Sequence, residues 1–239
     1  MALAADPKQN HFLAALPAAE LDRWLPHLEL IDMPLGTVLY EPGETMSFAY
    51  FPVTSIVSLV YLLADGATTK VAAVGNESLI GIEQFLGAQS APWRAFVQSA
   101  GQGFRVKWSV LAQDLGEPSR LMHLLLRNTQ ALMTQIAQVA VCNRHHSVEQ
   151  QVCRWLLLSL DRLQSNEVVV TQELIAEMLG VRRQGVGAAT RAMVGAGVIS
   201  YRRGSIKVLD RKRLEQRCCE CYAVIKREYK RLLPATPVA

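Results

Sequence analysis

Cysteine is absent from the first 141 residues of this 239-residue chain, and the cysteines that follow are Cys142, Cys153, Cys218, Cys219 and Cys221. An odd number of cysteines, without the regular spacing of small secreted domains, excludes a disulfide framework. The N-terminal residues include Asp6 and Lys8 and lack the apolar segment that a signal peptide needs. We therefore expect a protein of the reducing cytoplasm.

Charged residues are also sparse, at 19% of the chain with a formal net charge of +4, but they are unevenly distributed. Residues 1–146 contain 9 Lys and Arg against 12 Asp and Glu, a net −3, whereas residues 147–239 contain 16 against 9, a net +7. A basic C-terminal part is typical of a domain that faces a polyanion. A solvated basic surface without a partner is the alternative.

Long apolar helices are not predicted either. Residues 45–64 carry no charge over roughly the length that crosses a bilayer, but they include Pro52 and five Ser or Thr residues. Alternating pieces such as SIVSLVYLL favour strands over a membrane helix. We therefore expect no membrane association.

Short antiparallel strands are predicted over about residues 33–108, where β-branched and aromatic runs are broken by Pro-Gly, Asp-Gly and Gly-Asn. Asp65-Gly66, between SLVYLLA and ATTKVAAV, predicts a two-residue hairpin. A second strand pair is predicted for RAFVQSA and GFRVKWS, which Gly101 and Gly103 divide. Together these strands indicate a small barrel or β-roll.

Helical periodicity begins at Ser119. An a/d seam at alternating spacings of three and four is formed by Met122, Leu125, Thr129, Leu132, Ile136 and Val139. Further apolar residues outside the seam are Leu121, Leu124, Leu126, Met133 and Ala140. A helix apolar on two sides must be covered twice, which favours its own β-roll on one side and a second copy of the chain on the other. A core helix within one chain is the alternative.

Two helices joined by a glycine-bearing turn follow a further helix at about residues 147–163. Thr171 is a natural N-cap for QELIAEMLG, and Gly180 suits the left-handed exit from that helix. The next helix begins around Arg182 and turns Val186, Ala189 or Thr190, and Met193 inward. This layout is a helix-turn-helix, in which the start of the second helix meets base edges.

The residues at that start are Arg182, Arg183 and Gln184. Arginine can form two hydrogen bonds with guanine, and glutamine can do the same with adenine. Gly185 and Gly187 follow at once, although each interior glycine costs a helix about 0.8–1 kcal/mol relative to alanine. They allow either a closer approach to DNA or closer packing against a neighbouring helix.

The segment GVISYRRGSIKVLD then predicts a strand, a tight turn and a strand, with cations at and after the turn. Between Gly180 and Leu214 there are nine Lys and Arg and one acid, Asp210. A basic hairpin after such a helix pair is typical of a wing that contacts phosphate.

Over nearly its full length the chain resembles bacterial transcription regulators of the Crp/Fnr type, most clearly in TQELIAEMLGVRRQGVGAATRAMVGAGVISYRRGSIKVLD. The resemblance implies an α+β fold with a jelly-roll-like, cyclic-nucleotide-binding-like β-roll over residues 1–118. A dimerisation helix would follow over 119–146 and a winged helix-turn-helix domain over 147–239. It also implies a homodimer that binds double-stranded DNA, with RNA polymerase as a further partner if the protein activates transcription.

By the same resemblance, Arg183 and Gln184 occupy the first two base-reading positions, beside Arg182. The third position, one turn on, falls at Ala188, where many relatives carry arginine. The operator of the best-known members is therefore not expected here. The predicted phosphate contacts are Thr171, Gln172, Arg191, Arg202, Arg203 and Lys207.

The family's effector pocket uses a Gly-Glu pair and an Arg followed by Ser or Thr, and here the corresponding residues are Gly81, Glu83 and Arg94. Glu83 is displaced by one residue, and Ala95 follows Arg94 where a hydroxyl would hold phosphate. These departures argue against cyclic AMP, so the effector is unknown.

Iron–sulfur members of the family use clustered N-terminal cysteines, and their absence excludes such a cluster. Cys142, His145 and His146 share a helical face and offer sulfur and nitrogen ligands, but a fourth ligand is missing. The CCEC segment at residues 218–221 lacks the paired CxxC spacing of zinc sites. No metal is therefore predicted, while haem ligation by His123 or His145 stays open.

Two other function classes are the alternatives. One is an enzyme with Cys142 as nucleophile and His145 or His146 as base, but nothing orients that base and there is no glycine-rich phosphate loop. The other is an effector-binding module that acts through protein partners, with an incidental basic wing. The DNA-binding regulator is favoured over both, and we do not expect an enzyme.

Overall fold

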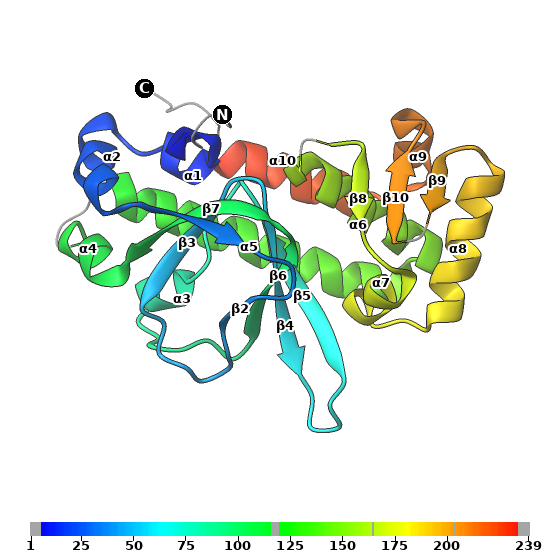
Figure 1. The fold of residues 1–239 in the computed structure, drawn as a ribbon, viewed down its shortest axis with the longest axis horizontal. Helices are drawn as coiled ribbons and strands as arrows, with labels where there is room; N and C mark the ends of the chain where they lie inside the picture. The colour runs from blue at the N-terminus through cyan, green and yellow to red at the C-terminus, as the bar shows by residue number, and fades with distance from the viewer. Residues whose placement is uncertain (1–5, 116–119, 164, 203, 234–239) are drawn as a thin grey trace. The chain divides into compact units, whose positions relative to one another are not determined.

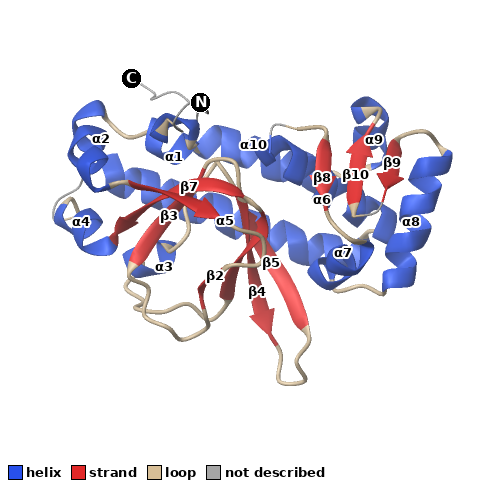
Figure 2. Ribbon diagram, in the orientation of Figure 1, coloured by secondary structure: helices blue, strands red, loops and turns tan. Residues whose placement is uncertain are grey.

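The computed structural model describes residues 6–115, 120–163, 165–202 and 204–233 (Figure 1). The chain divides into two compact units. The first comprises Met1–Leu59, Ala73–Thr134 and Arg227–Ala239, and the second comprises Val60–Ala72 and Gln135–Lys226. Helices and antiparallel sheets alternate along the chain (Figure 2), which confirms the predicted α+β class. None of the helices in the described residues is long and apolar enough to cross a membrane.

The N-terminal strands form the predicted β-roll. Their bounds are β1 Glu29–Met33, β2 Val38–Tyr40, β3 Phe48–Pro52, β4 Ile56–Leu62, β5 Thr68–Val74, β6 Arg94–Ser99 and β7 Gly101–Lys107. One sheet has the order β1-β7-β3 and the other β2-β6-β4-β5. Side chains that alternate along β3 and β6, such as Ala49, Phe51, Ala95 and Val97, are fully buried between them.

The predicted hairpin joins β4 and β5, which are neighbours in the sheet. Its turn is one residue longer than predicted, because the Leu63 amide donates to the Ala67 carbonyl at 2.8 Å and so encloses Ala64, Asp65 and Gly66. Gly66 has φ +83°, the left-handed conformation that a three-residue hairpin loop requires at this position.

The predicted pairing of RAFVQSA with GFRVKWS is wrong. Both segments form strands, β6 and β7, but they lie in different sheets. Gly101 and Gly103 belong to β7, and they do not form a turn between paired strands. A Cβ on Gly101 would come within 2.5 Å of the Thr54 backbone, and one on Gly103 within 2.8 Å of Met33 Sδ. The two glycines are therefore required for close packing.

Short helices accompany the roll, and one long helix follows it. The short helices are η1 Pro7–Gln9, α1 His11–Ala14, α2 Ala18–Trp24, η2 Leu25–His27, α3 Ile82–Phe85 and α4 Trp108–Gln113. The long helix is α5, Arg120–His145, close to the predicted 119–146, of which Ser119 lies outside the described residues. Within the chain α5 buries three residues of the predicted seam, Leu125, Leu132 and Val139. Leu126, Met133 and Val141 remain largely exposed.

The second unit holds the C-terminal helices and a small sheet. Its elements include α6 Val148–Leu163, β8 Glu167–Val169, α7 Gln172–Leu179, α8 Arg183–Gly195, β9 Ile199–Arg202, β10 Ser205–Val208 and α9 Arg211–Arg217. The last helix is α10, Cys221–Leu232, of which Arg227–Leu232 belongs to the first unit. The sheet has the antiparallel order β8-β10-β9, and α8 packs on α6, α7 and β9. This is the predicted winged helix-turn-helix arrangement (Figure 1).

Candidate nucleic-acid interface

The turn between α7 and α8 is fixed by local chemistry. Thr171 caps α7, because its Oγ1 accepts a hydrogen bond from the Leu174 amide at 3.2 Å. Gly180 ends α7 with φ +65°, a conformation that glycine adopts without strain. Arg182, with extended backbone angles, then stands at the N-cap of α8. The sequence signals therefore place both ends of the turn correctly.

The start of α8 presents the predicted base-reading residues to solvent. Arg182, Arg183, Gln184 and Ala188 are all exposed. The opposite side of α8 is held in the core by fully buried side chains, namely Val186 and Met193. Because the buried side fixes the rotation of the helix, the two arginines and the glutamine share the open side.

Arg183 is engaged by a neighbouring carboxylate. Its Nε lies 3.2 Å from Glu173 Oε2, and both side chains are more than half exposed. An exposed pair of this kind contributes about 0–1 kcal/mol. The contact orders the guanidinium only weakly and leaves it available to another acceptor. Sequence reasoning did not identify Glu173 as a partner of Arg183.

Gly185 and Gly187 of α8 face protein neighbours. A Cβ on Gly185 would come within 3.5 Å of Val148 Cγ2 in α6, an ordinary contact. One on Gly187 would lie 3.3 Å from Gln172 Oε1 and 3.4 Å from an Arg191 guanidinium nitrogen, which is tight. Gly187 thus leaves room for the side chains of Gln172 and Arg191 to converge. These contacts favour close packing as the reason for Gly187, whereas the contact at Gly185 is not tight enough to require a glycine.

The predicted phosphate contacts lie on α7, α8 and the wing. Thr171, Arg191, Arg202 and Lys207 are exposed, and Gln172 is half-buried. Arg203 lies outside the described residues. Gly204, with φ +72°, allows the tight turn between β9 and β10, so that Arg202 lies at the end of one wing strand.

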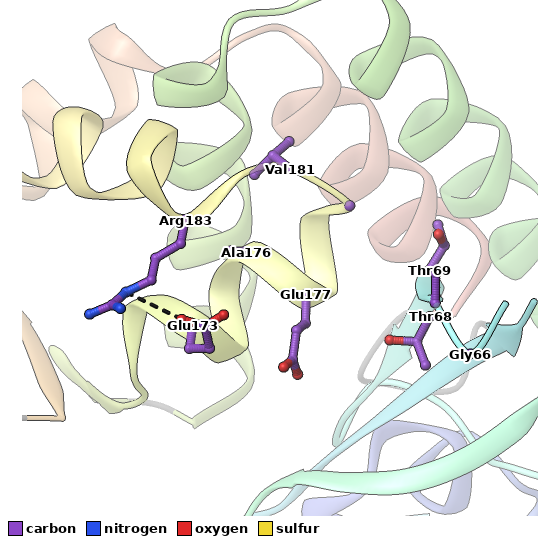
Figure 3. Close-up of a pocket in the computed structure, with 10 residues that line it drawn as sticks. Gly66, Thr68, Thr69, Glu173, Ala176, Glu177, Val181 and Arg183 are labelled. Atoms are coloured by element: carbon purple, nitrogen blue, oxygen red, sulfur yellow. Dashed lines mark ion pairs between the residues drawn. The ribbon is translucent and has the colours of Figure 1, made fainter.

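An open groove of about 540 Å³ adjoins Arg183 (Figure 3). Gly66, Thr68 and Thr69 of the β4–β5 hairpin form one wall, and Glu173 and Glu177 of α7 form part of the other. The negative charges of these two carboxylates would repel a phosphate bound in this groove. Sequence reasoning missed the groove because its walls lie more than 100 residues apart along the chain.

The predicted effector residues lie in the first unit, in surroundings unlike those of a phosphate site. Arg94 Nε donates to Glu41 Oε2 at 2.7 Å, so its charge is already matched. Glu83 is buried, and burial raises the pKa of its carboxyl. A Cβ on Gly81 would lie 3.1 Å from Trp108 Nε1, so the space above this glycine is occupied.

A pocket of about 210 Å³ beside Tyr40 and Tyr50 lies in the same unit. Ligand pockets usually measure about 300–1,000 Å³. This pocket is therefore small for a nucleotide.

Cys142 lies in a buried cluster with other cysteines. Its side chain is fully buried, and a hydrogen bond to Cys219 together with burial raises the pKa of its thiol. Reactive cysteines are partly exposed thiolates, so this environment disfavours Cys142 as a nucleophile. His145 is exposed, whereas His146 is partly buried and its Nδ1 lies 3.6 Å from Cys221 Sγ.

The comparison with known families identifies the C-terminal part of the chain. Residues 150–217 match the model of the Crp-like helix-turn-helix domain. This range contains α7, α8 and the wing, and so includes each predicted base-reading residue and phosphate contact. No curated protein matches the chain significantly.

Solved structures extend the likeness to most of the chain. FixK2 from Bradyrhizobium japonicum gives a TM-score of 0.67 at 18% identity, covering 80% of this chain and 98% of that one. A putative Crp/Fnr-family transcriptional regulator from Eubacterium rectale gives 0.66 at 16% identity, covering 84% and 94%. The c-di-GMP-responsive global regulator CLP from Xanthomonas campestris gives 0.62 at 16% identity, covering 80% and 99%. The chain thus has the fold of Crp/Fnr-family transcription regulators and carries a Crp-like helix-turn-helix domain at residues 150–217.

Proposed function

We propose that the protein is a homodimeric, sequence-specific DNA-binding transcription regulator of the Crp/Fnr type. The observation that carries the proposal is the joint exposure of Arg182, Arg183 and Gln184 at the start of α8, within a Crp-like helix-turn-helix domain. Arginine and glutamine are the side chains that read guanine and adenine with paired hydrogen bonds in the major groove.

Different residues of this surface contact the bases and the phosphates. Arg183 and Gln184 contact base edges, with Arg182 beside them, and Ala188 offers an apolar contact to a thymine methyl group. The phosphate backbone is bound by the two cations of the wing, Arg202 and Lys207, together with Thr171, Gln172 and Arg191. Phosphate contacts fix the register and supply affinity without reading sequence.

The proposed dimer face is the exposed apolar side of α5. Leu126, Met133 and Val141 are 50%, 60% and 46% exposed, which is unusual for apolar residues on one helix. Leu126 and Met133 are seven residues apart, the repeat of a helix–helix seam. This face lies beside the seam predicted from sequence, half of which the chain itself buries. A two-fold dimer would place two copies of α8 in successive major grooves, about 34–36 Å apart.

The β-roll is proposed to sense an effector other than cyclic AMP. The ion pair between Arg94 and Glu41 supports this, since a cyclic phosphate would have to displace the carboxylate. An effector changes DNA binding only if its affinity differs between two arrangements of the dimer. We also propose a cytoplasmic location, with RNA polymerase as a partner if the protein activates transcription.

The experiment is the selection of bound duplexes from a random pool by the purified protein at about 150 mM salt, near physiological ionic strength. The expected result is an enriched palindrome with half-sites about one helical turn apart. The double variant Arg182→Ala, Arg183→Ala, which keeps the buried side of α8, is the matched control and should enrich nothing. If neither the native protein nor the double variant enriches a sequence, the result would instead favour a module that acts through protein partners.

A further inference from the structure

Four side chains with metal-binding chemistry meet in the second unit. Cys142 lies in the last turn of α5, and His146 directly follows that helix, with its amide donating to the Cys142 carbonyl at 3.0 Å. Cys219 lies in the connection between α9 and α10, and Cys221 is the first residue of α10. The three sulfurs and one imidazole nitrogen all lie within 4.8 Å of one another. Sequence reasoning found a fourth ligand missing beside Cys142, His145 and His146. In the structure the group consists of Cys142 and His146 with two cysteines of the CCEC segment, and His145 does not belong to it.

Two of the six pairs of ligand atoms have the spacing of a tetrahedral site. Cys142 Sγ lies 3.6 Å from Cys219 Sγ, and Cys221 Sγ lies 3.6 Å from His146 Nδ1. Zinc with bonds of about 2.3 Å to sulfur and about 2.0–2.1 Å to nitrogen, at tetrahedral angles, separates two sulfurs by about 3.8 Å and a sulfur from a nitrogen by about 3.6 Å. A disulfide would require about 2.05 Å.

We propose that Cys142, His146, Cys219 and Cys221 bind one Zn²⁺ as a structural Cys₃His site. This set of ligands is among the common structural zinc sets. The three cysteines are buried, and the side chain of His146 is 13% exposed, so the site is closed and lacks the open position of a catalytic centre. The proposal does not depend on DNA reading by α8.

Neighbouring groups complete the site. Glu220 Oε1 lies 3.4 Å from His146 Nε2, the ring nitrogen opposite the one that faces Cys221. A carboxylate in this place fixes the ring orientation and tautomer of a zinc-bound histidine. Arg154, a buried residue of α6, donates from Nε to Cys142 Sγ at 3.2 Å. Zn²⁺ with three thiolates carries one net negative charge, which the guanidinium offsets.

The ligands also bracket the helix-turn-helix domain. Cys142 and His146 precede residues 150–217, and Cys219 and Cys221 follow them. One bound ion would therefore join the beginning and the end of this domain. We expect the metal to hold the domain's two ends together and to raise its resistance to unfolding.

The first test is the metal content of the full-length protein, purified without chelator or added metal. We expect one zinc per chain by elemental analysis. After zinc removal under reducing conditions, added Co²⁺ should give the visible bands of a tetrahedral thiolate site, and zinc should abolish them. A sample with no zinc and no cobalt bands would overturn the proposal, as would iron with sulfide or a Cys142–Cys219 disulfide by mass spectrometry.

The second test uses variants. Cys142→Ser, Cys219→Ser and Cys221→Ser should each lose most of the zinc. The controls are Cys153→Ser and Cys218→Ser, and both should keep one zinc per chain. Cys153 is buried in the same unit but contacts Met193 Sδ at 3.5 Å instead of the cluster. Full zinc retention by every ligand variant would refute the assignment.

A positioning variant covers the case in which the ligand variants do not fold. Glu220→Gln removes only the charge facing His146 Nε2, and Glu220 is largely exposed. It should fold and bind zinc about 10- to 100-fold more weakly in competition with a chelator, as expected for loss of a partner to a zinc-bound histidine. An unchanged affinity would show that His146 is not held as a ligand in this way.

Discussion

Replacing Arg183 by alanine tests whether this residue reads sequence or only contributes charge. The side chain is exposed at the first turn of α8, and its recorded partner is the carboxylate of Glu173 at 3.2 Å. A paired contact to guanine is worth about 1–3 kcal/mol of discrimination. Against this, the native protein must give up the exposed Glu173 contact, at about 0–1 kcal/mol.

Taken at mid-range, about 2 kcal/mol less about 0.5 kcal/mol leaves about 1.5 kcal/mol for each half-site, since the two effects oppose each other. A symmetric dimer loses the contact twice, so Arg183→Ala should weaken binding to the selected site by about 3 kcal/mol, or about 150-fold. Binding to a scrambled duplex should fall much less, because phosphate contacts supply nonspecific affinity. Arg183→Lys keeps the charge but loses the planar guanidinium. Its affinity for the selected duplex should lie between those of the native protein and Arg183→Ala.

The assay is fluorescence anisotropy with the selected duplex and its scrambled counterpart at several salt concentrations. The informative quantity is the ratio of the two dissociation constants. If Arg183→Ala weakens both duplexes equally and leaves the ratio unchanged, Arg183 contacts phosphate and the assignment of base reading is wrong. Circular dichroism of each variant checks that the helices are intact.

Three further outcomes are expected. Arg202→Ala and Lys207→Ala should each weaken selected and scrambled duplexes alike and reduce the salt slope by about 1 per protomer, and a sequence-dependent loss would contradict a phosphate role. Met133→Glu should shift the protein toward monomer in analytical ultracentrifugation because Met133 is 60% exposed on the proposed dimer face, whereas Gln138→Glu, on another side of α5, should not. Burial raises the pKa of the Glu83 carboxyl above 4.5 in the folded protein, so the folded state holds this proton more tightly than the unfolded state does. The stability of the native protein therefore falls as the pH rises above 4.5. Glu83→Gln should therefore be the more stable protein in urea at neutral pH and lose its advantage below pH 4.5, and parallel stability curves would disprove the effect.

The C-terminal domain could be predicted closely from sequence because its signals are local. Thr171 caps α7 and Gly180 ends it, and each acts through backbone groups within four residues. Apolar periodicity then fixed the rotation of α8, so the exposure of Arg183 followed from the burial of Val186 and Met193. Where neighbours along the chain determine a structural feature, the pattern of residues is sufficient to predict that feature.

The β-roll shows where that reasoning fails. Gly101 and Gly103 were interpreted as a turn because glycine commonly interrupts strands. In β7 they are instead required by approaching groups, the backbone of Thr54 and the side chain of Met33, which lie some 50 to 70 residues away along the chain. The identity of a nonlocal neighbour is not encoded in spacing. The same limit explains why the pairing of β6 and β7 was wrong although both strands were predicted.

The cysteine cluster depends both on residues that are close in sequence and on residues that are far apart in sequence. The spacing of Cys142, His145 and His146 is local, and it predicts one shared helical face, but no metal was predicted because a fourth ligand was missing. The CCEC segment at residues 218–221 was discounted because it lacks the paired CxxC spacing of zinc sites. That rule describes sites in which each pair must be held by its own short loop. Here the helix holds one pair, and Cys219 and Cys221 need only reach the sulfur and imidazole already in place, at 3.6 Å in each case. A metal site can therefore be missed when each pair of ligands is judged by its own spacing, since the requirement that matters is that both pairs meet.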